Sequence, residues 1–542
     1  MTSPTDRIRP ADPVPRRLAD LAAAFDLAAA SDPTTAGTDA ADGVPPGTTV
    51  SAVASDNRVV APGDLFVALP GARSHGAGFA EDAVRRGATA VLTDRDGAAA
   101  LGGLTVPVLV TDDPRVVLGP VAAWVHGEPA EHLATFGVTG TNGKTTTTYQ
   151  VDHLLRALGH RSGLVGTVET RAGDRVLPSR LTTPEAADLQ ALLATMREVG
   201  VDALAMEVSS HAVAMHRVDG IVFDVAGFTN LSQDHLDFHG DLPTYFAAKA
   251  ELFTPARSRR GVVVVDDAWG ERMAATAGVP VETVRTVAAE GEAPVADWSV
   301  SDVTPHGTGS AFTLTHADGR TLRTSTSLPG AFNVANAALA VVMVLASGVP
   351  LADVSAALTT VDGLSARVPG RMEVVGAGGD GHPRVVVDFA HNTDAVELAL
   401  AALRPTTAGR LVVVFGATGD RDPGKRPAMG AAAVAGADVV VLTDDDPHDE
   451  DAAKVRGEVL AGATAAQETA RAAGREVTVV ETAPRDAAIR RAVLEAGPAD
   501  TVLVAGRGHE TIQEVRGVDV ALDDRVEART ALRARSERTP SA

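Results

Sequence analysis

Residues 137–147 decide the fold, and they read Gly137-Val138-Thr139-Gly140-Thr141-Asn142-Gly143-Lys144-Thr145-Thr146-Thr147. The mostly apolar run from Leu133 to Val138 predicts a strand before this stretch. After it, Val151, Leu154, Leu155 and Leu158 recur on one helix face that Gly159 can end. A strand, a glycine-rich turn and a helix opening on Lys-Thr are typical of a phosphate-binding loop. The strict pattern has glycine where Val138 stands, so an ordinary turn is the alternative; the Gly-Lys-Thr-Thr ending favours a nucleoside triphosphate site.

The composition is typical of a multidomain α/β protein. With 542 residues, the chain is long enough for several domains, and three is the natural expectation. Hydrophobic residues make up 45% and aromatic residues 3%, so the cores must be built from Val, Leu and Ala. The formal charge is 48 − 70 = −22 and no basic block occurs. This charge argues against nucleic acid or an anionic membrane as the main partner.

No segment of the sequence indicates export or membrane insertion. Met1 to Pro15 lacks the apolar region of a signal peptide, and apolar runs such as Val262 to Val265 are too short to span a bilayer. The chain has no cysteine, which excludes disulfides and thiolate metal sites and fits a cytoplasmic enzyme. We therefore expect a cytoplasmic protein, without membrane insertion, that acts as a monomer.

The pattern of strands and helices predicts an α/β protein of three domains, at residues 1–132, 133–368 and 369–542. The first is a small α/β domain in which 31–48 predicts a loop and Pro107 places the strand over 106–110 at a sheet edge. The second is a mostly parallel P-loop sheet with antiparallel strands over 298–327, and one of its helices is expected to start at Thr183-Pro184 and end before Gly200. Five strands alternate with helices in the third domain, which predicts a Rossmann-like layout.

Three charged groups follow the phosphate loop near the ends of successive strands, where open α/β sheets bind their ligands. Glu207 ends one strand, His235 follows the next, and Lys249 comes shortly afterwards. A carboxylate beside the hydroxyl of a phosphate loop supplies the oxygen ligands that Mg²⁺ needs in addition to phosphate. Each group alone is as often a solvated or structural side chain. Their order behind the loop favours a catalytic site.

Several motifs together resemble the Mur ligases, and within that family the tripeptide synthetases. They are Gly140 to Thr146, Glu207-Val208-Ser209-Ser210-His211, Thr229 to Asp237, Phe332-Asn333-Val334-Ala335-Asn336, and the leading-domain stretches Ser55 to Arg58 and Pro62 to Leu69. The resemblance runs from about Ser55 to Gln513. It implies one domain for a UDP-sugar, one for ATP, and one that closes over both. It also implies that ATP phosphorylates the carboxylate of UDP-MurNAc-L-Ala-D-Glu and that a diamino acid attacks the acyl phosphate, a step of peptidoglycan precursor synthesis.

The resemblance also implies a role for individual residues. Lys144 would hold the β- and γ-phosphates, and Thr145, Glu207 and His235 would surround Mg²⁺. Lys249 matches a lysine that the family carbamylates, which would give an anionic ligand for a second Mg²⁺. The implied nucleotide contacts are Gly140, Thr141, Asn142, Gly143, Lys144, Thr145, Thr146, Asn333, Arg371 and Asp388. Those to the UDP-substrate are Asn57, Thr182, Thr183, Ser209 and Arg217, and those to the amino acid are Arg421, Asp445, His448, Gly506 and Glu510.

The sequence departs from the family pattern where the substrates would bind. Asn57 replaces a usual Ser, Met215 replaces a common Gln, and His448 replaces the Arg by which diaminopimelate-adding members hold their substrate. A histidine with a pKa of about 6.5 is mostly neutral at pH 7. Acidic residues between 444 and 451 would repel a carboxylate and attract an ammonium, although they could also raise the pKa of His448. The sequence favours L-lysine or L-ornithine over meso-diaminopimelate.

Two other functions remain open from the sequence. A folylpolyglutamate synthase also joins an amine to an activated glutamyl carboxylate, but the separate leading domain favours the muramyl substrate. A nucleotide-binding partner protein without catalytic activity is the second alternative. The presence of Lys144, Glu207, His235 and Lys249 argues against that alternative.

Overall fold

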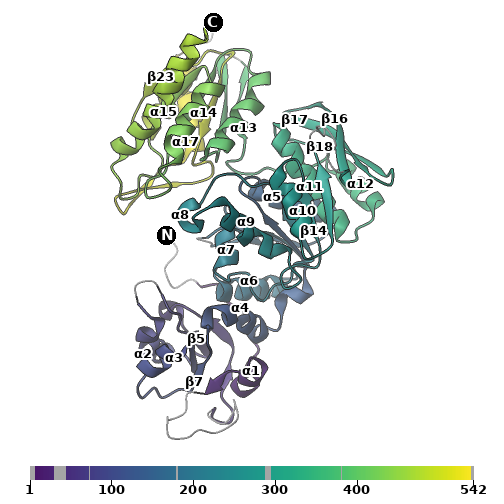
Figure 1. Ribbon diagram of the computed structural model, residues 1–542, viewed down its shortest axis with the longest axis vertical. Coiled ribbons are helices and arrows are strands. Elements are labelled where there is room, and N and C mark those ends of the chain that lie inside the picture. The colour runs from purple at the N-terminus through teal and green to yellow at the C-terminus, as the bar shows by residue number, and fades with distance from the viewer. Residues whose placement is uncertain are drawn as a thin grey trace.

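The computed structural model describes residues 7–29, 44–71, 74–178, 181–286, 295–379 and 381–538. Three sheets with their helices stack along the long axis, and we call them the N-terminal, central and C-terminal bodies (Figure 1). They are α/β layers, which confirms the predicted fold class. Most of the loop expected at 31–48 lies outside the described residues. Among the residues that are described, no helix is long and apolar enough to cross a membrane.

The N-terminal body contains a five-stranded sheet in the order β2-β7-β6-β5-β4. Its strands are β4 (Ala52–Ala54), β5 (Asp64–Val67), β6 (Ala90–Thr93), β7 (Val108–Val110) and the antiparallel β2 (Ala28–Ala29); its helices are α1 (Leu18–Ala24), α2 (Ala80–Arg86), α3 (Arg95–Ala100) and α4 (Pro114–Val125). The expected edge position of the strand near Pro107 is wrong, because β7 pairs with both β6 and β2. Pro107 precedes the strand and contributes only its carbonyl, which accepts from Val91 N–H, so its missing donor costs nothing.

The central body is built on an eleven-stranded sheet in the order β11-β10-β9-β12-β8-β13-β14-β15-β16-β17-β18. Six strands are mutually parallel: β8 (Ala134–Thr139), β9 (Ser162–Val165), β12 (Ala203–Glu207), β13 (Val225–Phe228), β14 (Gly261–Val264) and β15 (Val281–Arg285). Strands β13 and β14 are buried over their whole length and consist of apolar residues and glycine, as expected where helices cover both faces of a sheet. The predicted antiparallel extension is confirmed as β16 (Trp298–His306), β17 (Gly309–His316) and β18 (Thr321–Thr326). The short strands β10 (Thr170–Ala172) and β11 (Arg175–Leu177) form the opposite edge.

Helices α5 (Lys144–Ala157) and α11 (Ala331–Ala346) pack on one face of this sheet, and α6 (Ala186–Glu198) packs on the other. The remaining helices are α7 (Ser210–Ala214), α8 (Leu236–His239), α9 (Leu242–Ala250), α10 (Ala268–Thr276) and α12 (Leu351–Thr360). The expected start of α6 at Thr183-Pro184 is wrong, because the chain stays extended through Glu185. The Thr183 hydroxyl donates to the Glu207 carbonyl instead of capping the helix. Leu189, Leu192, Leu193 and Met196 are buried on α6, which ends before Gly200 as expected.

The C-terminal body has a six-stranded sheet in the order β19-β20-β24-β21-β22-β23. Five strands are parallel: β20 (His382–Asp388), β24 (Thr501–Ala505), β21 (Leu411–Phe415), β22 (Val439–Leu442) and β23 (Thr478–Glu481); β19 (Glu373–Gly379) is antiparallel. Its helices are α13 (Thr393–Leu403), α14 (Lys425–Gly436), α15 (Ala452–Ala472), α16 (Arg485–Glu495) and α17 (Asp524–Arg538), and a hairpin joins β25 (Ile512–Val515) to β26 (Val518–Ala521). The Rossmann-like prediction is confirmed.

Candidate active site

The phosphate-type loop lies between β8 and α5, at the carboxyl edge of the central sheet. Gly143 immediately precedes the helix, with φ of +87°, and a Cβ atom there would lie 2.3 Å from the Asn336 side-chain oxygen. A Cβ atom at Gly140 would lie 1.8 Å from the Thr229 hydroxyl. Both positions therefore require glycine for reasons of space, and at Gly143 for the backbone conformation as well. The loop leaves the first N–H groups of α5 facing the cavity described below.

Two lysines converge on this loop. Lys144 Nζ donates to the carbonyls of Gly140, at 2.9 Å, and Thr141, at 2.8 Å. Lys249 Nζ, buried on α9, also donates to the Gly140 carbonyl, at 2.8 Å, and lies 4.3 Å from the centre of the Tyr245 ring. Burial lowers the pKa of both lysines, and the charge of Lys144 lowers that of Lys249 further, well below its usual range. Lys249 is therefore a group that readily becomes a neutral amine.

Glu207 connects the loop to the neighbouring strand end. Its carboxylate accepts from the Thr145 hydroxyl at 3.0 Å and from the Thr167 hydroxyl at 3.1 Å. Arg371, from the C-terminal body, donates to the same Thr145 hydroxyl at 3.2 Å. A hydroxyl beside a carboxylate is a suitable pair of oxygen ligands for Mg²⁺. Among the described residues no group of three or more His, Asp or Glu side chains is placed so that it could hold a metal ion.

Asp234 and His235 lie where the central and C-terminal bodies meet. Burial works to raise the pKa of Asp234, but His391, with Nε2 at 3.7 Å, and Lys425, with Nζ at 3.7 Å, hold it far below its usual range. Burial lowers the pKa of His235 to about 3, so its ring is neutral at pH 7. His235 has φ of +54°, a costly conformation for histidine that is often retained at functional sites.

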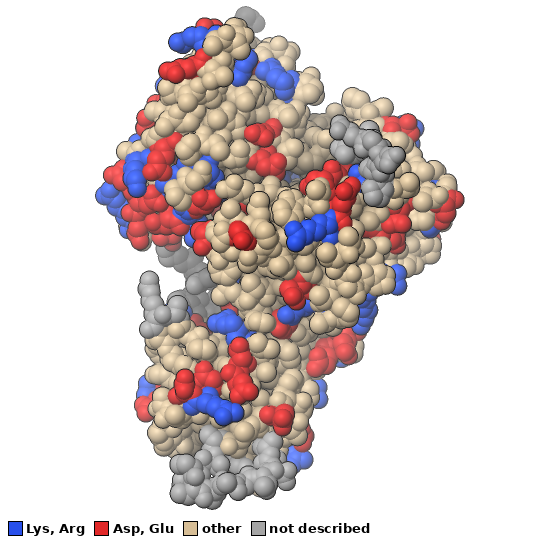
Figure 2. All heavy atoms as spheres, viewed as in Figure 1, with Lys and Arg blue, Asp and Glu red and all other residues tan. Residues whose placement is uncertain are grey.

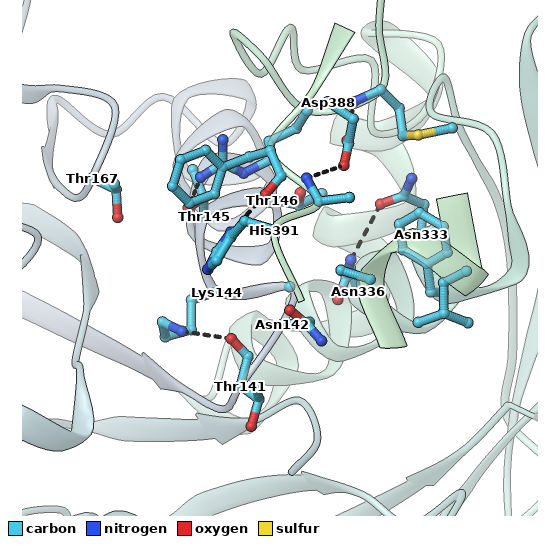
Figure 3. A pocket seen from close by; sticks show the side chains of 18 of the residues that line it. Thr141, Asn142, Lys144, Thr145, Thr146, Thr167, Asn333, Asn336, Asp388 and His391 are labelled. Carbon is cyan, nitrogen blue, oxygen red and sulfur yellow. Dashed lines mark hydrogen bonds between the residues drawn. The ribbon is translucent and has the colours of Figure 1, made fainter. Parts of the chain in front are cut away.

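A cavity between the central and C-terminal bodies unites most of the predicted nucleotide contacts (Figure 3). It is lined by Thr141, Asn142, Gly143, Lys144, Thr145, Thr146, Thr167, Glu207, Phe332, Asn333, Asn336, Arg371, Met372, Asp388, Phe389, Ala390, His391, Ala395 and Leu398. One side is polar and the other is apolar, with Arg371 stacked 4.2 Å from the Phe389 ring centre. That division suits phosphates at one end and a base at the other. Gly140, His235 and Lys249 do not line the cavity.

Hydrogen bonds fix the polar groups of this cavity. Asp388 accepts from the backbone N–H groups of Met372, at 2.6 Å, and Ala390, at 2.9 Å. Burial raises the pKa of Asp388, and these two hydrogen bonds oppose the increase because they stabilise the ionised carboxylate. Asn336 donates to Asn333 at 3.2 Å, as Figure 3 shows. The sequence did not predict Thr167 as a site residue, and it gave Asn336 only as part of the Phe332-to-Asn336 motif, without a nucleotide contact.

The predicted contacts to the UDP-substrate fall into two places. Thr182 and Thr183 lie on the segment before α6, and Ser209 N–H donates to the Thr183 hydroxyl at 3.3 Å. Arg217 joins them through the Thr183 carbonyl, at 3.4 Å, and through Glu185, at 2.9 Å. Asn57 lies apart on η1 (Asn57–Val59) of the N-terminal body, where it donates to Asp82 at 2.8 Å. A ligand that touched all five residues would have to span the two bodies.

Two of the predicted amino-acid contacts, His448 and Glu510, line a second cavity, of about 660 Å³, at the edge of the C-terminal body. Asp446, His448, Glu510, Glu514, Asp519 and Arg525 are among its lining residues. Burial, with the charges of Asp445 and Asp446, raises the pKa of Glu510 to about 8. Asp445 directs an unpartnered, buried oxygen toward Gly506, where a Cβ atom would lie 2.4 Å from it. Arg421 lies outside both cavities and is exposed.

The expected anionic rim around His448 is only partly present. Asp444 pairs with Arg456, Glu450 with Arg426, and Asp446 with the buried Arg507. These acids are therefore neutralised locally, which the sequence did not reveal because their partners lie on other elements. His448 itself bonds Glu514 at 3.1 Å. Acidic side chains still gather on the visible face of the C-terminal body in Figure 2.

A phosphate-type loop on a parallel sheet, facing a Rossmann-like body across a cavity, defines a P-loop nucleotide-binding protein. The family models "Mur ligase family, catalytic domain", "Mur ligase middle domain" and "Mur ligase, glutamate ligase domain" match residues 49–126, 138–344 and 370–508. The chain belongs to the Mur ligase family.

Individual relatives agree with this assignment over nearly the whole chain. The UDP-N-acetylmuramyl-tripeptide synthetase of Leifsonia xyli subsp. xyli is 48% identical over 98% of this chain and 99% of its own length. The UDP-N-acetylmuramoyl-L-alanyl-D-glutamate--2,6-diaminopimelate ligase of Streptomyces avermitilis is 49% identical over 89% of this chain and 92% of its own. A solved structure of an enzyme with that same name is 30% identical, covers 90% of this chain and 95% of its own, and has a TM-score of 0.61.

Proposed function

We propose that this protein is the ATP-dependent ligase that adds a diamino acid to the D-Glu carboxylate of UDP-MurNAc-L-Ala-D-Glu, in peptidoglycan precursor synthesis. The observation that carries the proposal is the set of Lys144, Thr145 and Glu207 at one strand edge, closed by Arg371 from the opposite body. We assign the UDP-sugar to residues 1–132, ATP to 133–368, and the closing, amino-acid-admitting part to 369–542. A cytoplasmic monomer remains a prediction.

The residues fit a nucleotide and Mg²⁺. Lys144 would release the carbonyls of Gly140 and Thr141 and bind the outer phosphates, while Asn333, Arg371 and Asp388 would make further contacts to the nucleotide. Thr145, Glu207 and His235 would hold Mg²⁺, which when bound would neutralise charge on the phosphates. The terminal phosphoryl group passes to the D-Glu carboxylate and ADP leaves; the incoming amine then attacks the acyl carbon, and phosphate and a proton leave. The chain's part is to position the reactants and exclude water.

Lys249 has the properties of a lysine that reacts with CO₂. The reaction needs a neutral amine: Nζ bonds to the carbon of CO₂ and loses a proton, which leaves a carbamate. Burial and the charge of Lys144 favour the neutral amine. The product exchanges a cation for an anionic oxygen group beside the phosphate loop, as a second Mg²⁺ would require.

For the amino acid, we propose L-lysine or L-ornithine in preference to meso-diaminopimelate. Four acids line the second cavity: Glu514, Asp519, Asp446, which pairs with Arg507, and Glu510, whose raised pKa leaves it largely protonated at pH 7. The arginine in its lining, Arg525, already pairs with Asp523. A distal ammonium suits this environment better than a distal carboxylate. Because the Streptomyces relative is named for 2,6-diaminopimelate, that amino acid is the main competitor. A preference for it in kcat/KM of more than about tenfold, roughly 1.4 kcal/mol, would overturn this part of the proposal.

Mass spectrometry tests the whole proposal. The protein is incubated with ATP, Mg²⁺, UDP-MurNAc-L-Ala-D-Glu and an equal mixture of L-lysine, L-ornithine and meso-diaminopimelate, and the product mass identifies the added residue. Parallel reactions that offer a folate acceptor with glutamate distinguish a folylpolyglutamate synthase. ATP hydrolysis without any ligated product, or no hydrolysis at all, would contradict the proposed ligase and favour a nucleotide-binding partner protein.

A further inference from the structure

The segment before the first helix crosses from the N-terminal body to the central body. We call residues 7–12 the N-terminal strap. At one end Arg7 lies nearly buried, with 4% of its side chain exposed, and Ile8 packs against the apolar core of the central body. At the other end the backbone N–H groups of Ala11 and Asp12 donate to the Glu198 carboxylate, at 2.8 and 3.0 Å.

One guanidinium contacts both bodies. On the N-terminal body, Arg7 donates to Asp64 at 3.1 Å and to the Val53 carbonyl. On the central body, Arg7 Nε lies 3.4 Å from the Asp188 carboxylate. A guanidinium holds several acceptors in fixed directions, so it resists sliding in a way that apolar packing does not.

The partners of Arg7 flank the two halves of the proposed UDP-substrate site. Val53 and Asp64, on β4 and β5, bracket the loop that carries Asn57. Asp188 lies in the first turn of α6, directly after Thr182 and Thr183. Figure 1 shows α4 and α6 at the junction of the two bodies, where the two helices pack against each other. The position of the Asn57 loop relative to Thr182 thus depends on this junction.

The strap supplies cationic partners for acidic residues at the junction of the two bodies. Asp64 is fully buried, and apart from Ala61 N–H its partners are Arg7 and Arg9. Partial desolvation at the junction raises the pKa of Asp188, and the charge of Arg7 opposes this increase. Without Arg7 and Arg9, the buried Asp64 would lose both of its cationic partners, and Asp188 would lose the guanidinium that lies 3.4 Å away.

We propose that the strap sets the separation of the two bodies at the value that the UDP-substrate needs, with Arg7 as its positioning residue. The inference rests on the proposed function. It predicts that weakening the strap weakens binding of the UDP-substrate and leaves ATP binding unchanged, because the ATP cavity lies at the other junction.

The kinetic test uses two variants. The first variant, Arg7→Ala, removes the guanidinium. The second, Asp188→Asn combined with Glu198→Gln, changes only exposed side chains of the central body. The double variant remains informative if Arg7→Ala fails to fold. We expect KM for UDP-MurNAc-L-Ala-D-Glu to rise about fivefold or more, with KM for ATP within about twofold of wild type. Asp174→Asn, which removes an exposed carboxylate of the central body away from the strap, is the control. An unchanged KM for the UDP-substrate in both variants would overturn the inference.

A second measurement does not depend on the proposed reaction. Because the chain has no cysteine, Ala99→Cys on α3 and Asp353→Cys on α12, both exposed, place spin labels on the two bodies without further changes. Pulsed electron spin resonance should give a narrow distance distribution in wild type and a broader or displaced one in both strap variants. Identical distance distributions in wild type and in both variants would refute the proposal that the strap sets the separation of the two bodies. If wild type forms no ligated product but the distributions differ, the proposed function fails and the strap stands.

Discussion

Lys144 is the residue on which the nucleotide assignment depends most directly. Lys144→Ala should reduce ligation by about a hundredfold or more, because the transferring phosphoryl group loses its main positive partner. Steady-state ligation rates test this, with Lys454→Ala, an exposed lysine of α15, as the control. Near-native turnover of Lys144→Ala would exclude the phosphate-loop function.

For Lys249 we expect that a small carboxylate can restore activity to a variant that lacks the lysine side chain. Lys249→Ala should be nearly inactive, and formate or acetate should restore part of the rate by occupying the vacated anionic position. Lys144→Ala should not respond to the same carboxylates, because it lacks a cation. Full activity of Lys249→Ala without additives would contradict the carbamate.

The raised pKa of Glu510 predicts that both amino-acid binding and stability depend on pH. Its pKa of about 8 lies above the ordinary value of about 4.5, so it is largely protonated at pH 7. An incoming ammonium favours the ionised form, so KM for the amino acid should fall as pH rises from 7 to 9, and Glu510→Gln should lose this trend. The effect on stability has the opposite sign. The free energy of unfolding should decrease from about pH 4.5 to about pH 8, because over this range the unfolded chain has released the proton that Glu510 still holds in the folded protein. Parallel pH profiles in wild type and Glu510→Gln would show that another group titrates.

At the scale of the elements, the close packing of the phosphate loop predicts that an added Cβ atom prevents ATP binding. Gly143→Ala should abolish detectable ATP binding, because its Cβ atom would meet Asn336 at 2.3 Å in addition to the positive φ. Gly159→Ala is a matched control: its φ is +93° but nothing lies within 4 Å of the added Cβ. That control should lose only about 1 kcal/mol of stability and keep ATP binding. Isothermal titration with ATP compares the two; equal affinities would refute the steric argument.

At the scale of the whole molecule, the central and C-terminal bodies are joined at the phosphate loop itself. Asn142 donates to Asp394 of α13 at 2.9 Å and accepts from Asn392 at 3.2 Å. Asp394→Ala should therefore raise KM for ATP several-fold, since closure over the nucleotide loses a contact. Glu397→Ala, exposed on the same helix, should leave KM unchanged. Equal KM values in these two variants would contradict a role for this contact.

Local patterns in the sequence determined the elements and the chemistry of the loop. The phosphate loop, the helix after it, and the parallel strands that end in Glu207 and precede His235 all follow from glycine placement and hydrophobic periodicity, which act over a few residues. The fold class and the family followed from these motifs. The errors were local as well: Pro107 and Thr183 were interpreted by propensity, whereas a carbonyl contact to β6 and a hydroxyl bond to Glu207 decided their positions.

Only the tertiary structure decided which distant groups meet. Arg371 on Thr145, Asp394 on Asn142, and Arg7 between Asp64 and Asp188 each join residues far apart in sequence. Neither partner of such a pair carries a local signal of the other. The pKa values of Lys249 and Glu510 also depend on burial, which arises only when the bodies pack. The sequence therefore determined the candidate chemistry, and packing determined which side chains can perform it.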